Sequence, residues 1–349
     1  MGPFKLLPKL TKTSNILIRI AIVVVVYAYI YYQVFYKRDI HVTLGLLDDM
    51  IADKRFIPLF ISASLMMMAN LFIEAKKWQY LVSLKERVSA FTAIKAVFTG
   101  LSVSIFTPNR VGEFFGRIFF LEKTVPIEGI FMTVIGSISQ LLVTIVVGCI
   151  SLAFFLPIYY SPTDFQTELL MGILYVLGFL ANIIFLGLYL NISIVTELAK
   201  KVFKPEWKHW NHYIEIFSAY KSMELLKVFG MSLLRYMVFS TQFYLFLRAF
   251  DVPITVGQAM ILIPVIYLIT TSIPTIALSE LGVRGSVSVF LIGLFMTGHF
   301  TGVGDLQLRV FAASTCIWLI NIALPALIGT LFVFRLRFFG KPNSAVNDE

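Results

Sequence analysis

The sequence predicts an all-α, polytopic membrane protein that forms a single membrane domain over residues 1–349. Of its 349 residues, 58% are hydrophobic and only 14% are charged. A soluble domain does not have enough polar surface to cover so many apolar side chains. The apolar runs are continuous, without the two-residue alternation of a membrane barrel, and only helices otherwise satisfy their own backbone in lipid.

Six apolar runs are long enough to cross a bilayer core of about 30 Å as helices. The first run is read as an anchored helix rather than a signal peptide, because no small-x-small cleavage site follows it. The second is expected to end in the basic, aromatic segment Glu74–Trp78 at the cytoplasmic interface. The expected crossings are about 20–36, 57–74, 127–157, 168–191, 223–249 and 307–334.

The net charge of +9 comes mostly from short segments between these runs. Cytoplasmic loops of membrane proteins are rich in Lys and Arg, so we interpret these charges as orientation signals rather than a nucleic-acid surface. They predict a plasma (inner) membrane protein with both termini in the cytoplasm. Cys149 and Cys316 lie inside apolar runs and are expected to be buried rather than bridged.

The most basic connection, residues 192–222, is expected on the cytoplasmic side. Large apolar side chains recur in it every three to four residues, which predicts an amphipathic helix lying in the membrane interface. The recurring residues are Trp207, Trp210, Ile214, Phe217 and Tyr220.

A first broken unit is expected at 96–120. The run Ala96–Phe106 covers only about 16 Å at 1.5 Å per residue, so it cannot cross alone. Pro108 then ends the helix, and a return arm follows. We expect Thr107 to cap this arm, so that its first N–H groups, with Arg110 beside them, form an anion site at the middle of the membrane.

A second broken unit is expected at 255–296, with a first arm to Ile273, a turn through Pro274 and a return arm to Met296. Ser279 is expected to cap the return arm, with Glu280 at its first position. The first arm is long enough to span, so length leaves a re-entrant hairpin and two full crossings both open. Charge leaves both open too, because either option puts the flanking loops on the same side.

Residues 57–157 and 223–334 each contain a crossing, a broken unit and another crossing, but in opposite orientation. Such an inverted-topology repeat is typical of secondary transporters, where broken helices meet near the midplane.

Charged side chains at these breaks are the candidate site residues. Glu113 with Arg117, and Glu280 with Arg284, share a helix face at i,i+4. Arg235 lies deep in the fifth crossing, where a charge costs at least about 2.5–3.5 kcal/mol and usually faces a partner or a polar cavity. Gln140, Asn182, Gln242 and Asn321 are expected to line the same interior.

These charges also have a structural interpretation. The two Glu–Arg pairs would then neutralise themselves so that a polar kink survives in lipid, and Arg235 would pair with one of the glutamates. Gly112, Gly116, Gly282 and Gly285 are expected at close-packing positions. We predict no catalytic residues, metal or other cofactor, because the sequence shows no nucleophile with a base, no phosphate loop and no metal-ligand spacing.

The motifs resemble the membrane region of lysylphosphatidylglycerol synthases and its stand-alone relatives, the flippase-like family. The first family element is matched by Pro108, Arg110, Gly112, Glu113 and Arg117, and the second by Pro274, Gly282, Val283 and Arg284. Gly285 departs from the pattern, because the family usually has a glutamate there. No aminoacyltransferase domain is expected within residues 1–349, so the resemblance implies lipid translocation rather than lipid synthesis.

The sequence therefore predicts a flippase or scramblase-like protein that moves a phospholipid or polyprenyl-phosphate headgroup through a polar cavity between the repeats. The expected substrate-binding residues are Thr107, Arg110, Glu113, Arg117, Arg235, Ser279, Glu280 and Arg284. Two alternatives stay open: a non-transporting membrane subunit or regulator that binds lipid or a lipid-modifying enzyme, and a transporter of a small organic anion. The sequence leaves open which headgroup moves and whether the protein is a homodimer.

Overall fold

The computed structural model describes residues 53–105, 107–159, 165–202, 216–275, 277–296 and 303–333, together with Val24, and every regular element in these residues is a helix. The expected crossing at 20–36, most of the interfacial helix and both termini lie outside the described residues. The helices are α3 (Phe56–Val82), α4 (Ala90–Ser104), η3 (Pro108–Arg110), α5 (Gly112–Ile118), α6 (Pro126–Tyr159), α7 (Phe165–Leu190), α8 (Ile192–Val202), α10 (Ser222–Ala249), α11 (Val256–Ser272), α12 (Ala277–Met296), α13 (Val303–Trp318), η5 (Leu319–Ala323) and α14 (Leu324–Val333).

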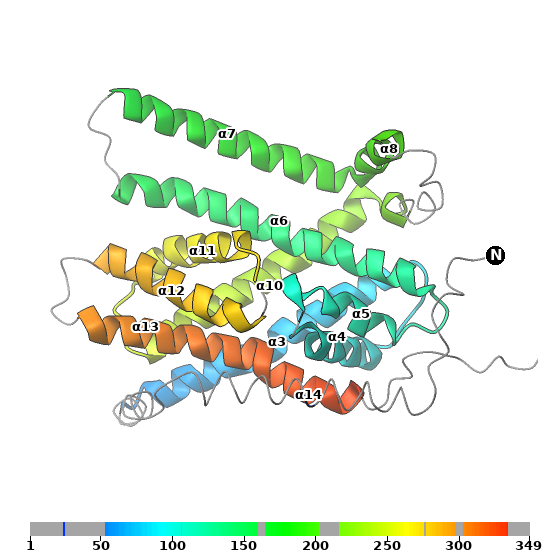
Figure 1. Ribbon diagram of the computed structural model, residues 1–349, viewed down its shortest axis with the longest axis horizontal. Coiled ribbons are helices and arrows are strands. Elements are labelled where there is room, and N and C mark those ends of the chain that lie inside the picture. The colour runs from blue at the N-terminus through cyan, green and yellow to red at the C-terminus, as the bar shows by residue number, and fades with distance from the viewer. Residues whose placement is uncertain are drawn as a thin grey trace, which may run out of the picture.

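Five of the described helical segments are long and apolar enough to cross a membrane, so the chain is a multi-pass membrane protein. They are Phe56–Val82, Pro126–Ile158, Phe165–Leu190, Ser279–Met296 and Asp305–Val333. The 28-residue helix α10 packs along α3, α6 and α13 in the middle of the bundle. Helix α7 lies at one side of the bundle, and the apolar stretch that qualifies it as a span has no buried residue, so its surface suits lipid (Figure 1).

Helix α3 is longer than the sequence predicts, and this changes the environment of its last turns. It continues to Val82 instead of ending near Glu74. Glu74, Lys77 and Trp78 therefore lie inside the bundle, where they are 7%, 1% and 1% exposed, and not at the membrane interface. The Trp78 indole N–H donates to Thr133 of α6, which satisfies its one polar atom. The interface assignment was wrong because this charged face points inward.

The first broken unit consists of α4, a kinked turn and the short helix α5. Ser89 caps α4 by accepting the backbone N–H of Thr92. At 15 residues α4 is about 22 Å long, too short to cross a core of about 30 Å. Asn109 and Arg110 then take left-handed backbone conformations, with φ of 47° and 57°. This interruption delays the return helix, which begins at Gly112 instead of at Pro108.

The polar groups of this turn bond to one another or to the second unit. Thr107 Oγ1 accepts the N–H of Gly112 at 2.9 Å, and the N–H groups of Arg110 and Val111 donate to the carbonyls of Thr107 and Pro108. The expected anion site at the start of the return arm is therefore wrong, because its N–H groups are already used. Thr107 does bind a backbone N–H, but as part of the turn.

Glycines let α4 and α5 pack closely. A Cβ atom on Gly116 would lie 2.6 Å from the Cα of Gly100, and one on Gly112 would lie 2.4 Å from the carbonyl oxygen of Val103. A Cβ on Gly285 of α12 would lie 2.3 Å from the ring of Phe311, so a glutamate there would require that ring to move. Gly282 is different, because no atom lies within 4 Å of an added Cβ.

The second broken unit pairs α11 with α12. Thr255 accepts the N–H of Gln258, and the Gln258 side chain accepts the N–H of Thr255, so α11 begins with a capping box. Helix α12 begins at Ala277, three residues earlier than the predicted first residue Glu280. Ser279 and Glu280 consequently lie inside its first turn, and Ser279 is not the cap.

The two broken units occupy opposite ends of the bundle, and their turns meet between them. Figure 1 shows α5 beside one half of α6 and α11 beside the other half, with α4 packed on α5 and α12 packed on α11. The Asn109 N–H donates to the carbonyl of Thr275 at 2.9 Å, and the Thr275 N–H donates to Asn109 Oδ1 at 3.2 Å. This reciprocal pair joins two turns that are 166 residues apart in the chain.

We predict that Gly116→Ala destabilises the protein, because the added methyl group meets backbone that cannot rotate away. Overpacking of this kind costs about 1–3 kcal/mol. Thermal unfolding in detergent measures it, and Gly282→Ala is the matched control because its added methyl has open space. A Gly116→Ala protein as stable as the control would contradict the close approach.

A surface carboxylate ties the α3–α4 loop to the loop before α6. Glu86 accepts the backbone N–H groups of Glu122, Lys123 and Thr124 at 2.8–3.1 Å, and also the Thr124 hydroxyl. Partial burial alone would raise the pKa of Glu86, but these bonds outweigh it and hold the pKa below its usual value.

We predict that this tie weakens in acid. Because the folded-state pKa of Glu86 is depressed, its stabilisation is present above the unfolded pKa and is lost as the pH falls through the folded pKa. Wild type should therefore unfold at a higher temperature than Glu86→Gln at pH 7, with a gap that closes below about pH 4. A gap of the same size across this pH range would disprove the role of the charge.

Candidate functional site

A polar cavity of about 430 Å³ lies where the two broken units meet. The long helices contribute residues from near their midpoints: Asn70 and Glu74 from α3, Gln140 from α6 and Arg235 from α10. The other polar lining residues come mainly from the broken units: Asn109, Arg110, Glu113, Arg117, Thr144, Thr270, Thr271, Thr275, Glu280, Arg284 and Asn321.

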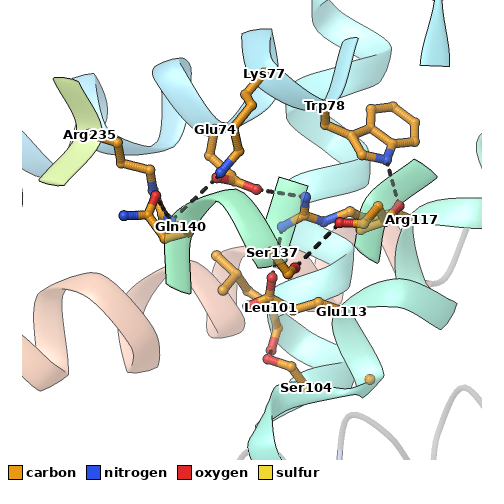
Figure 2. Close-up of polar contacts among 12 residues, drawn as sticks. Glu74, Lys77, Trp78, Leu101, Ser104, Glu113, Arg117, Ser137, Gln140 and Arg235 are labelled. Atoms are coloured by element: carbon orange, nitrogen blue, oxygen red, sulfur yellow. Dashed lines mark hydrogen bonds and ion pairs between the residues drawn. The ribbon is translucent and has the colours of Figure 1, made fainter. Parts of the chain in front are cut away.

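Glu74 is the centre of a buried ion cluster. Its carboxylate lies 2.8 Å from Lys77 Nζ, 2.8 Å from Arg117 Nη1 and 3.3 Å from Arg235 Nη1. Figure 2 shows these three cations converging on it from α3, α5 and α10. Arg117 also binds Glu113 at 2.7 Å, so both of its terminal nitrogens are paired with carboxylates. The side chains of Lys77 and Arg117 are only 2% and 4% exposed.

Arg235 joins this cluster to a chain of buried amides. Its Nε donates to Asn70 Oδ1 at 2.7 Å and its Nη1 donates to Gln140 Oε1 at 3.3 Å. Asn70 donates in turn to Asn321 at 3.2 Å, and Asn321 donates to Gln242 at 2.9 Å. The chain fixes the orientation of each amide, because every oxygen in it already accepts a bond.

Asn321 reaches this chain from an irregular stretch of helix. It lies in η5, a single π-helical stretch between α13 and α14. Such π-bulges inside α-helices are frequent at functional sites, because the extra residue redirects a side chain. Here the redirected side chain links the last described helix to α3 and α10.

A second ion cluster joins the two broken units. Glu280 of α12 pairs with Arg284 one turn later and with Arg110 of the first unit at 3.3 Å. The rings of Phe239 and Tyr267 lie 5.5 and 5.8 Å from the Arg284 guanidinium carbon and stabilise its charge. Arg284 is 7% exposed, so it too is a buried cation.

The structure brings six of the eight predicted site residues to this one cavity. Arg110, Glu113, Arg117, Arg235, Glu280 and Arg284 all line it. Thr107 and Ser279 were expected as caps that bind substrate, but they are not among the lining residues. Of the predicted interior amides, Gln140 and Asn321 line the cavity and Gln242 bonds to Asn321, whereas Asn182 lies on α7 and donates to Gly178.

Sequence reasoning missed Glu74, Lys77 and Asn70. Their spacing contains a signal: Asn70, Glu74 and Lys77 follow each other at i,i+4 and i+7, so they lie on one helix face. The basic and aromatic residues around Glu74 instead resembled a membrane interface. Extending the predicted helix by two turns would have placed this face in the interior.

The cavity carries an excess of positive charge. Four arginines and three glutamates line it among the described residues, and Lys77 lies directly behind Glu74. The arrangement therefore suits an anion. Arginine is the residue best matched to phosphate, because its planar donors fit the oxygens of the group.

The chain belongs to the family described as the lysylphosphatidylglycerol synthase TM region, whose model matches residues 16–304. The match covers the described helices from α3 to α12, and with them both ion clusters. Searches of curated proteins and of solved structures give no match. The family is a membrane domain, which agrees with the apolar helices and supports a lipid-related function.

We predict that Glu74→Gln destabilises the protein by about 3–5 kcal/mol, because it leaves Lys77 and Arg117 as buried charges without their main partner. Thermal unfolding in detergent checks this. The double variant Glu74→Gln/Lys77→Met should recover part of the loss, since it also removes one stranded cation. A neutral effect of the single variant would show that the cluster is not a stability element.

Proposed function

We propose that this family member is a lipid flippase or scramblase, which moves a phosphate-bearing headgroup through the cavity between its two halves. The arginine-rich cavity at mid-height of the bundle carries the proposal. Arg235 and Gln140 lie near the middle residues of α10 and α6, which are 28 and 34 residues long. A polar cavity at this depth is where a headgroup would have to cross the hydrocarbon core.

Exposed residues in the lining support a cavity that opens on its side, and such an opening would favour lipid over a water-soluble anion. Asn109, Leu141, Thr271 and Ile273 line it and are themselves exposed. These residues come from the middle of α6, from the last turn of α11 and from the turns of the broken units, so the opening would face the surface that contacts lipid tails. A headgroup would enter here while its tails stay in the bilayer.

The inverted repeat is part of this proposal, with 57–157 and 223–334 as its halves. Helix α4 packs on α14 of the other half, and α11 packs on α6 of the other half. Helices α3 and α10, which would be equivalent, pack on each other. Each half thus packs its broken unit on the last long helix of the other half. This reciprocal packing supports a two-fold axis in the membrane plane through the point where the turns meet. Both broken units would then be re-entrant.

The charged residues would have separate roles. Arg110, Arg235 and Arg284 would hold the phosphate, while Glu74, Glu113 and Glu280 would balance the arginines between transport events. Arg117 would mainly hold α5 against α3, because both of its terminal nitrogens already bind carboxylates. The protein would act without catalysis, in the inner membrane, with both termini in the cytoplasm.

We predict that Arg235→Ala and Arg110→Ala slow headgroup translocation about ten- to a hundredfold while the protein still folds. One hydrogen bond to a charged group contributes about 1.5–3 kcal/mol, which corresponds to this range. Proteoliposomes with fluorescent phospholipid and polyprenyl-phosphate probes, and a quencher added outside, measure the rate.

The matched control is Arg309→Ala. Arg309 of α13 binds Asp251 and Asp305 outside the cavity, so its loss should leave translocation unchanged. Full activity in both cavity variants would exclude the proposed path. If wild type moves no probe, the alternative of a membrane subunit that binds lipid or a lipid-modifying enzyme is favoured, and a search for a partner protein follows.

A further inference from the structure

We propose that the cavity selects headgroups with a net negative charge, and that the Arg284 guanidinium is the group that recognises their phosphate. This inference rests on the proposed function and names the class of headgroup. Phosphatidylglycerol, phosphatidic acid and polyprenyl phosphate belong to the class. Phosphatidylethanolamine does not, because an ammonium balances its phosphate, and neither does lysylated phosphatidylglycerol, whose net charge is positive.

The first support is the charge balance. The four arginines and three glutamates that line the cavity leave one positive charge, and Lys77 behind Glu74 adds another. An uncompensated charge in a low-dielectric interior is costly. A headgroup with a net negative charge reduces this cost. A headgroup whose ammonium balances its phosphate leaves the positive charge of the cavity unchanged.

The second support is that each of the three glutamates in the cavity already forms an ion pair with a cation of the protein. Glu74 binds three cations and Glu280 binds two. Glu113 binds Arg117, whose side chain is 4% exposed and cannot move into solvent to make room. A headgroup ammonium would have to displace a guanidinium or the Lys77 ammonium from one of these carboxylates. The cavity therefore offers little to a cationic group.

The third support is that two nitrogens of the Arg284 guanidinium carry N–H groups without a hydrogen-bond acceptor in the residues that the structure describes. Its Nη2 binds Glu280, but its buried Nε and Nη1 have no hydrogen-bond partner in the described part of the chain. The rings of Phe239 and Tyr267 stabilise the cation without supplying an oxygen acceptor to these N–H groups. Phosphate oxygens would satisfy them when the side chain turns these N–H groups toward the cavity that it lines.

Arg117 has one such atom too, but in a different setting. Its Nε has no hydrogen-bond partner among the described residues. That atom lies 3.3 Å from where a Cβ on Gly100 would be, so it faces the backbone of α4 at a close contact. Arg284 is therefore the buried arginine that is best placed to bind a headgroup.

The test compares lipids with identical fluorescent tails in proteoliposomes. Phosphatidylglycerol should cross at least tenfold faster than phosphatidylethanolamine and lysylated phosphatidylglycerol. Arg284→Gln should lower the phosphatidylglycerol rate to that of phosphatidylethanolamine, Arg284→Lys should restore part of the preference, and Arg309→Gln should retain it. Equal rates for the three headgroups in wild type would overturn the inference and leave the proposed function standing.

A purely structural role for Arg284 gives a different result, because Arg284→Gln would then slow all headgroups by the same factor, which would also overturn the inference. If no probe crosses, the proposed function fails and binding decides this inference. Thermal stabilisation in detergent by phosphatidylglycerol but not by phosphatidylethanolamine, and its loss in Arg284→Gln, would support it. Equal stabilisation by both lipids, or none, would overturn it.

Discussion

The fold depends on the burial of one carboxylate among three cations at the middle of a membrane domain. Glu74 takes partners from its own helix, from the short return helix α5 and from α10. None of these elements could keep its charge in lipid alone, because an isolated buried ion costs several kcal/mol. The cluster therefore ties together the long helices α3 and α10 and the first broken unit.

The broken units follow from the same constraint. A turn between two apolar helices leaves backbone N–H and C=O groups without helical partners, and in apolar surroundings each must find a partner within the protein. The bonds between Asn109 and Thr275, the bond from Gly112 to Thr107 and the Arg110–Glu280 pair provide such partners. Each turn is thus completed by residues of the other unit, and neither would be stable in lipid without it.

The sequence predicted much of this architecture for identifiable reasons. Helix length and proline placement located α6, α7, α10 and both broken units, since lipid allows few alternatives. Charges at intramembrane depth are rare and conspicuous, which is why six of the lining residues were found. Local rules failed where tertiary contacts decide: the backbone of Asn109 and Arg110, the start of α12 and the inward face of α3.

Glu74 shows why part of the candidate site could not be predicted from the sequence. A Glu, two Lys and a Trp at the end of an apolar run have the same composition whether the helix stops at the interface or continues into the bundle. Only the arginines of α5 and α10, which are 43 and 161 residues away in the chain, decide between the two. Since those arginines need a carboxylate as much as Glu74 needs them, an excess of intramembrane arginines over acids in a sequence is itself a sign that a buried acid has been assigned to the wrong place. Here four arginines faced only two assigned glutamates, Glu113 and Glu280, and the missing carboxylate is Glu74 of α3, which pairs with Arg117 and Arg235.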